Sequence, residues 1–164
     1  MKQRRLGDTA LQVSEICLGT MTFGSMADEA TSLQILDKAA DGSVDFFDVA
    51  ELYPVPPLPQ WAGKSEEILG KWLKGRARDS VVIATQDACD HRAHHEAGGG
   101  VRADADHVCH RLWTLSRDFV ASTIIGATRV EQLKDTLAAA SVTLPMDVLV
   151  KLDQITREIL YPMG

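Results

Sequence analysis

Short apolar runs alternate with amphipathic stretches along this 164-residue chain, and that alternation constrains the fold more than any other feature. Four runs have the length and composition of buried strands, at residues 16–19, 44–49, 80–85 and 122–126. Apolar side chains at helical spacing follow them, at residues 33–40, 65–73, 130–140 and 146–159. Because strands that alternate with helices form parallel βα units, we predict an α/β fold with about four parallel strands.

Two local patterns refine this prediction. Polar and apolar residues alternate over residues 3–13 around Gly7-Asp8-Thr9, which predicts a small N-terminal hairpin. Ser65 precedes two glutamates, and this order predicts a helix that Ser65 caps while the acidic residues complement the helix dipole. Four prolines between residues 54 and 59 exclude regular structure from the loop before that helix.

Composition narrows the class of protein. The net charge of −6 is the opposite of the basic footprint of a nucleic-acid binder, so no nucleic-acid partner is expected. No apolar run approaches the ~20 residues that cross a bilayer, and the charged N-terminus lacks the apolar core of a signal peptide. The three cysteines show no disulfide-framework spacing. We therefore expect a single domain, residues 1–164, in the cytoplasm and without a membrane partner.

Residues 87–118 differ from the rest of the chain. All five histidines and two of the three cysteines fall here, as Cys89, His91, His94, His95, His107, Cys109 and His110. These donors would suffice for zinc, but their spacing matches no strong zinc signature, and exposed histidines in a linker explain them more simply. We predict no metal site and interpret the segment as an atypical loop that joins residues 1–86 to residues 119–164.

One strand carries a candidate chemical group. The run Phe46–Tyr53 places an acidic side chain, Asp48, at the end of a strand and a phenol, Tyr53, five residues later, which is a pair able to donate a proton. This run resembles the active-site strand of the aldo-keto reductases. The resemblance extends to Arg5-Leu6-Gly7, to Leu18–Gly24, to Ser65–Gly70, and near the C-terminus to Ile124–Arg129 and Glu131-Gln132-Leu133.

The resemblance implies a (β/α)8 TIM barrel, which needs roughly 250 residues. With 164 residues and about four parallel strands, the chain is similar to an internally truncated member, a partial barrel whose middle is missing. A partial barrel leaves strand edges unpaired, and unpaired edges associate. If the chain folds, we therefore expect either a homo-oligomer formed through its exposed barrel edges or a poorly soluble monomer.

In the family, a carbonyl takes a hydride from NADPH and a proton from a tyrosine. A lysine beside that tyrosine lowers its pKa, and an aspartate pairs with the lysine. The resemblance assigns the tyrosine to Tyr53 and the aspartate to Asp48. The lysine should follow Thr85, but the sequence has Gln86. Without that cation, Tyr53 would titrate nearer the ordinary tyrosine pKa of ~10 and be a poorer acid.

The resemblance also implies cofactor contacts. It assigns the nicotinamide end to Thr20 and Met21, and the adenosine 2′-phosphate and adenine to Thr128, Arg129, Gln132 and Asp135. A helix N-terminus beside Arg129 is a favourable seat for a phosphate, although a solvated surface helix would have the same sequence. Further contacts would come from the missing strands, so NADPH affinity should be reduced.

Two functions follow from these observations. The first is NADP(H)-dependent reduction of aldehydes or ketones, with Tyr53 as the proton donor and with activity impaired by Gln86. The second is a non-catalytic remnant that at most binds a nucleotide or a protein partner.

Overall fold

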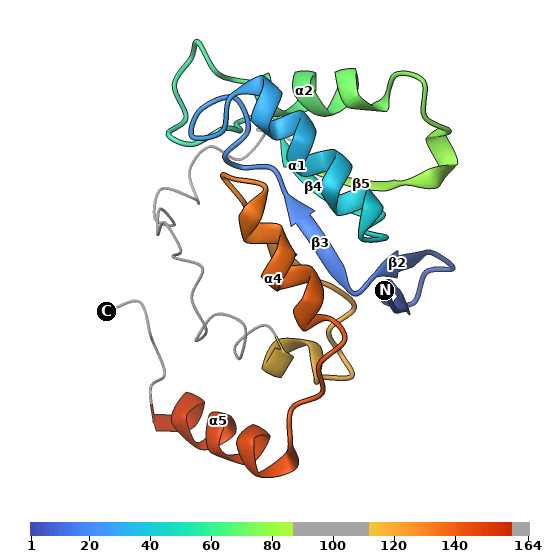
Figure 1. Ribbon diagram of the computed structural model, residues 1–164, viewed down its shortest axis with the longest axis vertical. Coiled ribbons are helices and arrows are strands. Elements are labelled where there is room, and N and C mark those ends of the chain that lie inside the picture. The colour runs from blue at the N-terminus through green and yellow to red at the C-terminus, as the bar shows by residue number, and fades with distance from the viewer. Residues whose placement is uncertain (87–111, 159–164) are drawn as a thin grey trace.

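A parallel four-stranded sheet lies at the centre of the computed structural model, which describes residues 1–86 and 112–158 (Figure 1). The strands are β3 (Ile16–Gly19), β4 (Phe46–Ala50), β5 (Val82–Gln86) and β6 (Thr123–Ile125), in the order β5-β4-β3-β6. All three pairings are parallel. This confirms the predicted α/β fold with four parallel strands, and the strands of the described residues do not close into a barrel.

The helices follow the strands as the alternation predicts. They are α1 (Glu29–Asp41), α2 (Lys64–Leu73), α4 (Glu131–Ala139) and α5 (Met146–Glu158), with a 3-10 helix at Arg78–Ser80 and a helical stretch at 112–115. Buried side chains of α1, α2 and α4 form one apolar core with the sheet, whereas α5 lies away from the sheet (Figure 1). No helix in the described part of the chain is long and apolar enough to cross a membrane.

The first helix shows why these segments are helical. The side chain of Asp28 accepts a hydrogen bond from the Thr31 amide at 2.8 Å and so caps α1. Glu29 lies in the first turn and complements the helix dipole. Ile35 and Leu36 are fully buried against the sheet. Capping and one apolar stripe together account for α1.

The predicted cap of α2 is wrong. The helix begins at Lys64, after Gly63, and Ser65 lies inside its first turn. Ser65 is fully buried, and its Oγ lies 2.6 Å from Thr20 Oγ1 and 2.9 Å from the Thr20 carbonyl oxygen. The hydroxyl therefore bonds to the loop after β3 instead of to its own helix.

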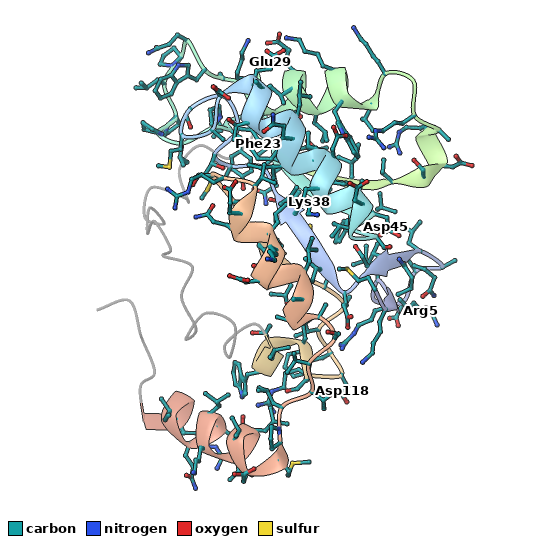
Figure 2. The ribbon with its side chains drawn as sticks, in the orientation of Figure 1. Arg5, Phe23, Glu29, Lys38, Asp45 and Asp118 are labelled. Carbon is teal, nitrogen blue, oxygen red and sulfur yellow. The ribbon has the colours of Figure 1, made fainter. Side chains whose placement is uncertain are left out.

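The predicted N-terminal hairpin is confirmed by the antiparallel pair of β1 (Gln3–Arg5) and β2 (Gln12–Ser14). Asp45, just before β4, holds it in place: its carboxylate accepts hydrogen bonds from the Ser14 amide at 2.8 Å and from Gln3 Nε2 at 2.7 Å. Figure 2 labels Asp45 beside the hairpin. The guanidinium of Arg4 donates to the carbonyls of Leu115 and Val120, which ties the hairpin to the C-terminal block as well.

The two faces of the sheet differ. On the helix face, which packs against α1, α2 and α4, the strands contribute Ile16, Leu18, Phe47, Val49 and Ile125 to the main core. Because side chains alternate along a strand, the opposite face carries Cys17, Phe46, Asp48, Ala84, Gln86 and Ile124, and we call it the open face. Val13 and Leu6 of the hairpin segment pack against Cys17 and Phe46 at the amino end of the open face.

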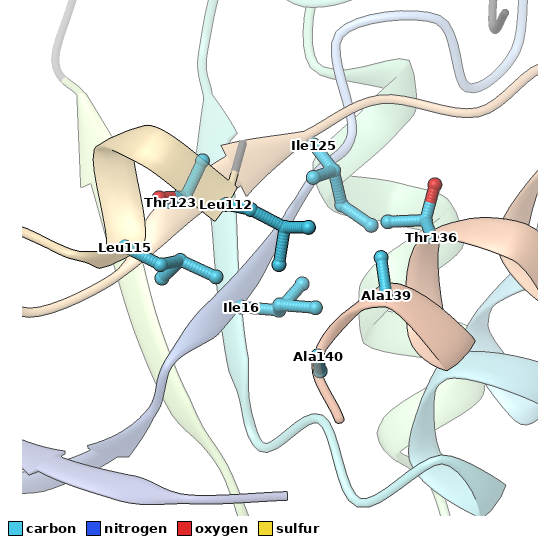
Figure 3. A pocket seen from close by; sticks show the side chains of 8 residues that line it. All are labelled: Ile16, Leu112, Leu115, Thr123, Ile125, Thr136, Ala139 and Ala140. Carbon is cyan, nitrogen blue, oxygen red and sulfur yellow. The ribbon is translucent and has the colours of Figure 1, made fainter. Parts of the chain in front are cut away.

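A small pocket lies on the helix face, between the sheet, α4 and residues 112–115 (Figure 3). Its lining is almost wholly apolar, and consists of Ile16, Leu112, Leu115, Thr123, Ile125, Thr136, Ala139 and Ala140. The Thr123 hydroxyl is buried there without a hydrogen-bond partner among the described residues. The pocket offers no ionisable side chain, so the candidate chemistry lies elsewhere.

Candidate functional site

The site residues predicted from the sequence gather at the carboxyl edge of the sheet. Asp48 lies near the end of β4, and Gln86 ends β5. Thr20 directly follows β3, and Thr128 follows β6 closely. Parallel strands end at one edge, which is where ligands bind in such sheets. Further hydrogen bonds join the loops there: Thr22 Oγ1 donates to the Ala127 carbonyl at 2.9 Å.

The Asp48–Tyr53 pair is the chemical centre of this edge. Tyr53 Oη donates a hydrogen bond to Asp48 Oδ2 at 3.4 Å. A turn after β4 makes this possible, because the Tyr53 amide donates to the Ala50 carbonyl at 3.0 Å and brings the phenol back over the strand. Asp48 is only 7% exposed, and Tyr53 is half-buried. The two side chains are therefore coupled in a partly dehydrated position.

The electrostatics of this pair oppose proton donation. Burial raises the pKa of Asp48, and its hydrogen bond from Tyr53 offsets this only in part. Burial, and then the nearby Asp48 charge, raise the pKa of Tyr53 above the ordinary tyrosine value of 10.0. Replacement of the expected lysine by Gln86 predicts a Tyr53 pKa near the ordinary tyrosine value. The pKa of Tyr53 in the structure is higher than this prediction. Over residues 1–86 and 112–158 no cationic side chain forms an ion pair with Asp48. Tyr53 thus holds its proton more tightly than a free tyrosine.

Gln86 stands where the resemblance to the family leads us to expect a lysine. The β4–β5 register pairs Asp48 with Ala84 and Ala50 with Gln86, so Gln86 lies on the open face, diagonal to Asp48. Its side chain is exposed and uncharged. A longer cationic side chain at this position could reach the Asp48–Tyr53 pair, but the amide of Gln86 brings no compensating charge.

Cys17 lies on the same face, in β3. Burial, and to a lesser extent the Asp48 charge, raise the pKa of its thiol to about 12. The thiol is neutral at physiological pH, and only a thiolate is an effective nucleophile. Cys17 is therefore a packing residue of the open face.

Thr20 and Met21 form the loop between the β3 and β4 ends. Thr20 is fully buried, and its hydroxyl donates to the Asp48 carbonyl at 2.9 Å. Met21 is half-buried, and its carbonyl accepts from the Val55 amide at 2.9 Å. Thr20 thus fixes the backbone of Asp48, and Ser65 in turn fixes Thr20. This role of Ser65 is not predicted by the sequence pattern, although a small polar residue on the apolar side of a helix is the available signal.

The start of α4 forms the other end of the site. Gln132 Oε1 accepts hydrogen bonds from the amide of Thr128 at 2.7 Å and from the amide of Arg129 at 3.1 Å. The side chains of Arg129 and Asp135 are exposed. Two amides, a guanidinium and a helix N-terminus are donors that suit a phosphate, provided that the Gln132 carbonyl moves aside.

The histidine and cysteine donors at residues 89–110 lie outside the described residues. In the described part of the chain, no group of three or more His, Cys, Asp or Glu side chains is placed to hold a metal ion.

Comparison with known proteins gives a family. The model of the Aldo/keto reductase family matches residues 15–114, which is more than half of the chain. Among curated proteins, the chain is 44% identical over 91 residues to an uncharacterized oxidoreductase of Bacillus subtilis, YrpG. It is 41% identical over 87 residues to the protein Tas of Escherichia coli. Each match covers 52% of this chain, and the chain spans about a quarter of each relative, 26% and 25% respectively.

Solved structures of similar proteins include the holo form of the aldo-keto reductase AKR11C1 from Bacillus halodurans. That match has a TM-score of 0.44 and 24% identity, and it covers 96% of this chain and 47% of the other. A putative aldo-keto reductase from Pseudomonas aeruginosa matches with a TM-score of 0.43 and 24% identity, over 95% of this chain and 55% of the other.

Proposed function

Because this chain belongs to the aldo/keto reductase family, we propose that it is an oxidoreductase that uses NADP(H) to reduce aldehydes or ketones at a lowered rate. One observation carries the proposal: Tyr53 and Asp48 form a hydrogen-bonded pair at the carboxyl edge of a parallel sheet. The family and the oxidoreductase relative support the reaction class. A cytoplasmic location is part of the proposal, in keeping with cysteines that lack disulfide-framework spacing.

In this proposal Tyr53 is the general acid. NADPH, when bound, supplies the hydride for the carbonyl carbon. Tyr53 Oη gives its proton to the carbonyl oxygen as negative charge develops there, which completes the alcohol and leaves a phenolate that solvent reprotonates. The neighbouring Asp48 carboxylate disfavours that phenolate, since its charge raises the pKa of Tyr53. A general acid that is poorly tuned costs about 10²–10⁴ in rate, and we expect a loss of that order.

The cofactor would be held mainly from the C-terminal block. The Arg129 guanidinium and the amides of Thr128 and Arg129 would contact the 2′-phosphate once Gln132 releases those amides, and the Gln132 side chain would itself contact the adenosine end of the cofactor. Asp135, exposed on the same helix, would lie toward the adenine. At the other end Met21 would meet the nicotinamide, while the buried Thr20 would hold the Asp48 backbone in place. Opening the Gln132 contacts costs free energy, so the affinity should be modest.

A second function, nucleotide or partner binding without turnover, is favoured by a separate observation. The position diagonal to Asp48 holds the uncharged Gln86, and the pKa of Tyr53 is raised. In this second function Tyr53 is too weak an acid to protonate a carbonyl oxygen. The site then binds a phosphate through Thr128 and Arg129 but does not catalyse reduction.

The two functions are separated by one set of measurements. NADPH binding is followed by cofactor fluorescence, and turnover by loss of NADPH absorbance with a broad-specificity aldehyde. We expect slow turnover that Tyr53→Phe abolishes and that Tyr161→Phe, at the only other tyrosine in the sequence, leaves unchanged. Binding without turnover would support the second function. No binding at millimolar NADPH would exclude the reductase and leave only a protein-partner role.

A further inference from the structure

The sheet has two open edges among the described strands, β5 on one side and β6 on the other. The Val82 amide donates to the Asp45 carbonyl, and the backbone groups of alternate residues in a parallel strand point to opposite sides. The amides and carbonyls of Ile83 and Thr85 therefore point away from β4. In the same way the Thr123 amide donates to the Glu15 carbonyl, so the backbone of Ile124 points away from β3. Among residues 1–86 and 112–158, no strand pairs with the outward-pointing donors and acceptors of either edge.

These two edges complement each other. All four strands run in the same direction, so a two-fold axis parallel to them sets β5 of one copy beside β6 of the other in parallel orientation. The same operation creates the second, identical contact. Two copies of a four-stranded sheet then supply eight strands, the number in a closed (β/α)8 barrel. Pairing β5 with β5 would instead leave both β6 edges open.

The same two-fold axis brings the open faces of the two copies together. Ile124 of β6 is 59% exposed although it is apolar and lies in a strand, and Val82 and Ala84 of β5, at the opposite edge, are only half-buried. Side chains that point into a small barrel fill its interior. A second copy related by the two-fold axis would apply its own open face to this one and remove these apolar side chains from water.

We propose that two copies of this chain form a closed, eight-stranded dimer in which β5 of each copy pairs with β6 of the other. The loop after β6, with Thr128 and Arg129, then lies beside Gln86 of the other copy. Each candidate site is completed by both chains. The assembly needs no turnover, so it stands or fails independently of the reductase proposal.

Molar mass in solution tests the dimer. We expect the full chain to have twice the monomer mass of 17.9 kDa in sedimentation equilibrium. Ile124→Lys would bury an unpaired charge in the barrel and should raise the dissociation constant about 100-fold or more. Thr85→Pro should do the same from the other edge, because proline removes the amide that points outward. Met26→Lys is the matched control, since Met26 is 60% exposed in the loop before α1 and should leave the dimer intact.

Circular dichroism verifies that each variant is folded. A wild-type chain that stays monomeric at all concentrations would overturn the proposal. A dimer that survives both Ile124→Lys and Thr85→Pro would overturn it as well.

Cross-linking tests which edges meet. In a background with Cys89→Ser and Cys109→Ser, the Ala84→Cys and Ile124→Cys chains are treated with a short bismaleimide, separately and mixed. Both positions lie on the open face, and Cys17 is buried. We expect a covalent dimer only in the mixture. Cross-linking of either variant with itself, at the level of the mixture, would contradict the β5–β6 pairing.

Discussion

The helix face and the open face of the sheet differ in the side chains that they carry and in how well these are covered. The helix face is lined by apolar residues such as Leu18 and Phe47, which are fully buried under three helices. The open face carries the groups with chemical potential, Asp48 and Gln86, beside an exposed Ile124. Within residues 1–86 and 112–158, helices cover one face, whereas the other has no ion-pair partner for Asp48 and leaves Ile124 exposed.

The difference shows that the residues that stabilise the fold and the residues proposed to carry the chemistry lie on opposite faces of this sheet. Core packing on the helix face joins residues of β3, β4, β6, α1, α2 and α4, all of which the chain contains. The proposed chemistry would depend on a charge at one position of the open face, where the chain has Gln86. The packing of the helix face does not depend on that position, so the architecture can be kept whether or not the proposed acid is well tuned.

The largest expected effect is the loss of stability when a core side chain of the helix face is truncated. Phe47 is fully buried, and its ring centroid lies 5.2 Å from that of Trp72. Phe47→Ala should lower the free energy of unfolding by about 3–5 kcal/mol, which denaturation by urea would measure. Phe46, the preceding residue, points to the open face, and Phe46→Ala should lower the free energy of unfolding by about half as much. Both are compared in the Thr85→Pro background, so that dimer formation does not contribute. Equal losses would show that the two faces are equally well packed.

The second effect concerns the missing cation. Gln86→Lys places a positive charge on the open face, diagonal to Asp48, and should lower the pKa of Tyr53. If Tyr53 is the acid, kcat/KM should rise about 100-fold, within the range of general-acid catalysis. Phenolate absorbance, corrected with the Tyr53→Phe variant, follows the titration of Tyr53 directly.

Gln86→Met is the matched control, because it has similar length and no charge. A comparable gain in the methionine variant would mean that packing, and not charge, limits the rate. An unchanged Tyr53 titration in a folded lysine variant would break the link between this position and the acid.

The sequence predicted the helix face well because local patterns determine it. The apolar stripe of α1 and the run Ile16–Gly19 both have a single dominant periodicity, and the structure has them at those places. The edges of the elements were less predictable. Ser80 was expected to begin a strand but belongs to a 3-10 helix, and β5 begins at Val82. Hydrogen bonds to distant residues decide such boundaries, and no local pattern encodes them.

The open face was predictable only in part. The resemblance to the family placed Asp48 and Tyr53 in one site, and the structure brings them into contact. It could not show that Ser65 supports Thr20 across 45 positions of sequence, or that Gln132 covers the amides at the start of α4. Both depend on how separate βα units pack, which the spacing of residues within one unit does not reveal.

A smaller effect is expected from a polar group left unpaired on the helix face. The Thr123 hydroxyl is buried in the apolar pocket without a partner among the described residues. Thr123→Val replaces it with a methyl group of similar size and should raise the free energy of unfolding by about 1 kcal/mol. Thr123→Ser keeps the hydroxyl and serves as the control. Destabilisation by valine would indicate that the hydroxyl has a partner in solution.

The smallest effect comes from the buried charge of Asp48, and its size depends on pH. Because burial raises the pKa of Asp48 above 3.8, the folded state binds a proton more readily than the unfolded state. Its contribution to stability is therefore full below pH 3.8 and is lost as pH rises through the folded pKa. Asp48→Asn removes the buried charge. At pH 7 it should therefore raise the free energy of unfolding, on the order of 1 kcal/mol or less.

The gain from Asp48→Asn should disappear below pH 3.8, and Asp45→Asn, just before the same strand, offers a contrast. Asp45 accepts hydrogen bonds from the Ser14 amide and from Gln3, so its replacement should destabilise the fold at pH 7. Urea denaturation of both variants between pH 3 and pH 7, roughly, would compare their free energies of unfolding with that of the wild type. If Asp48→Asn destabilised the fold at pH 7, the carboxylate would have a compensating cation in solution, and the open face would not lack one.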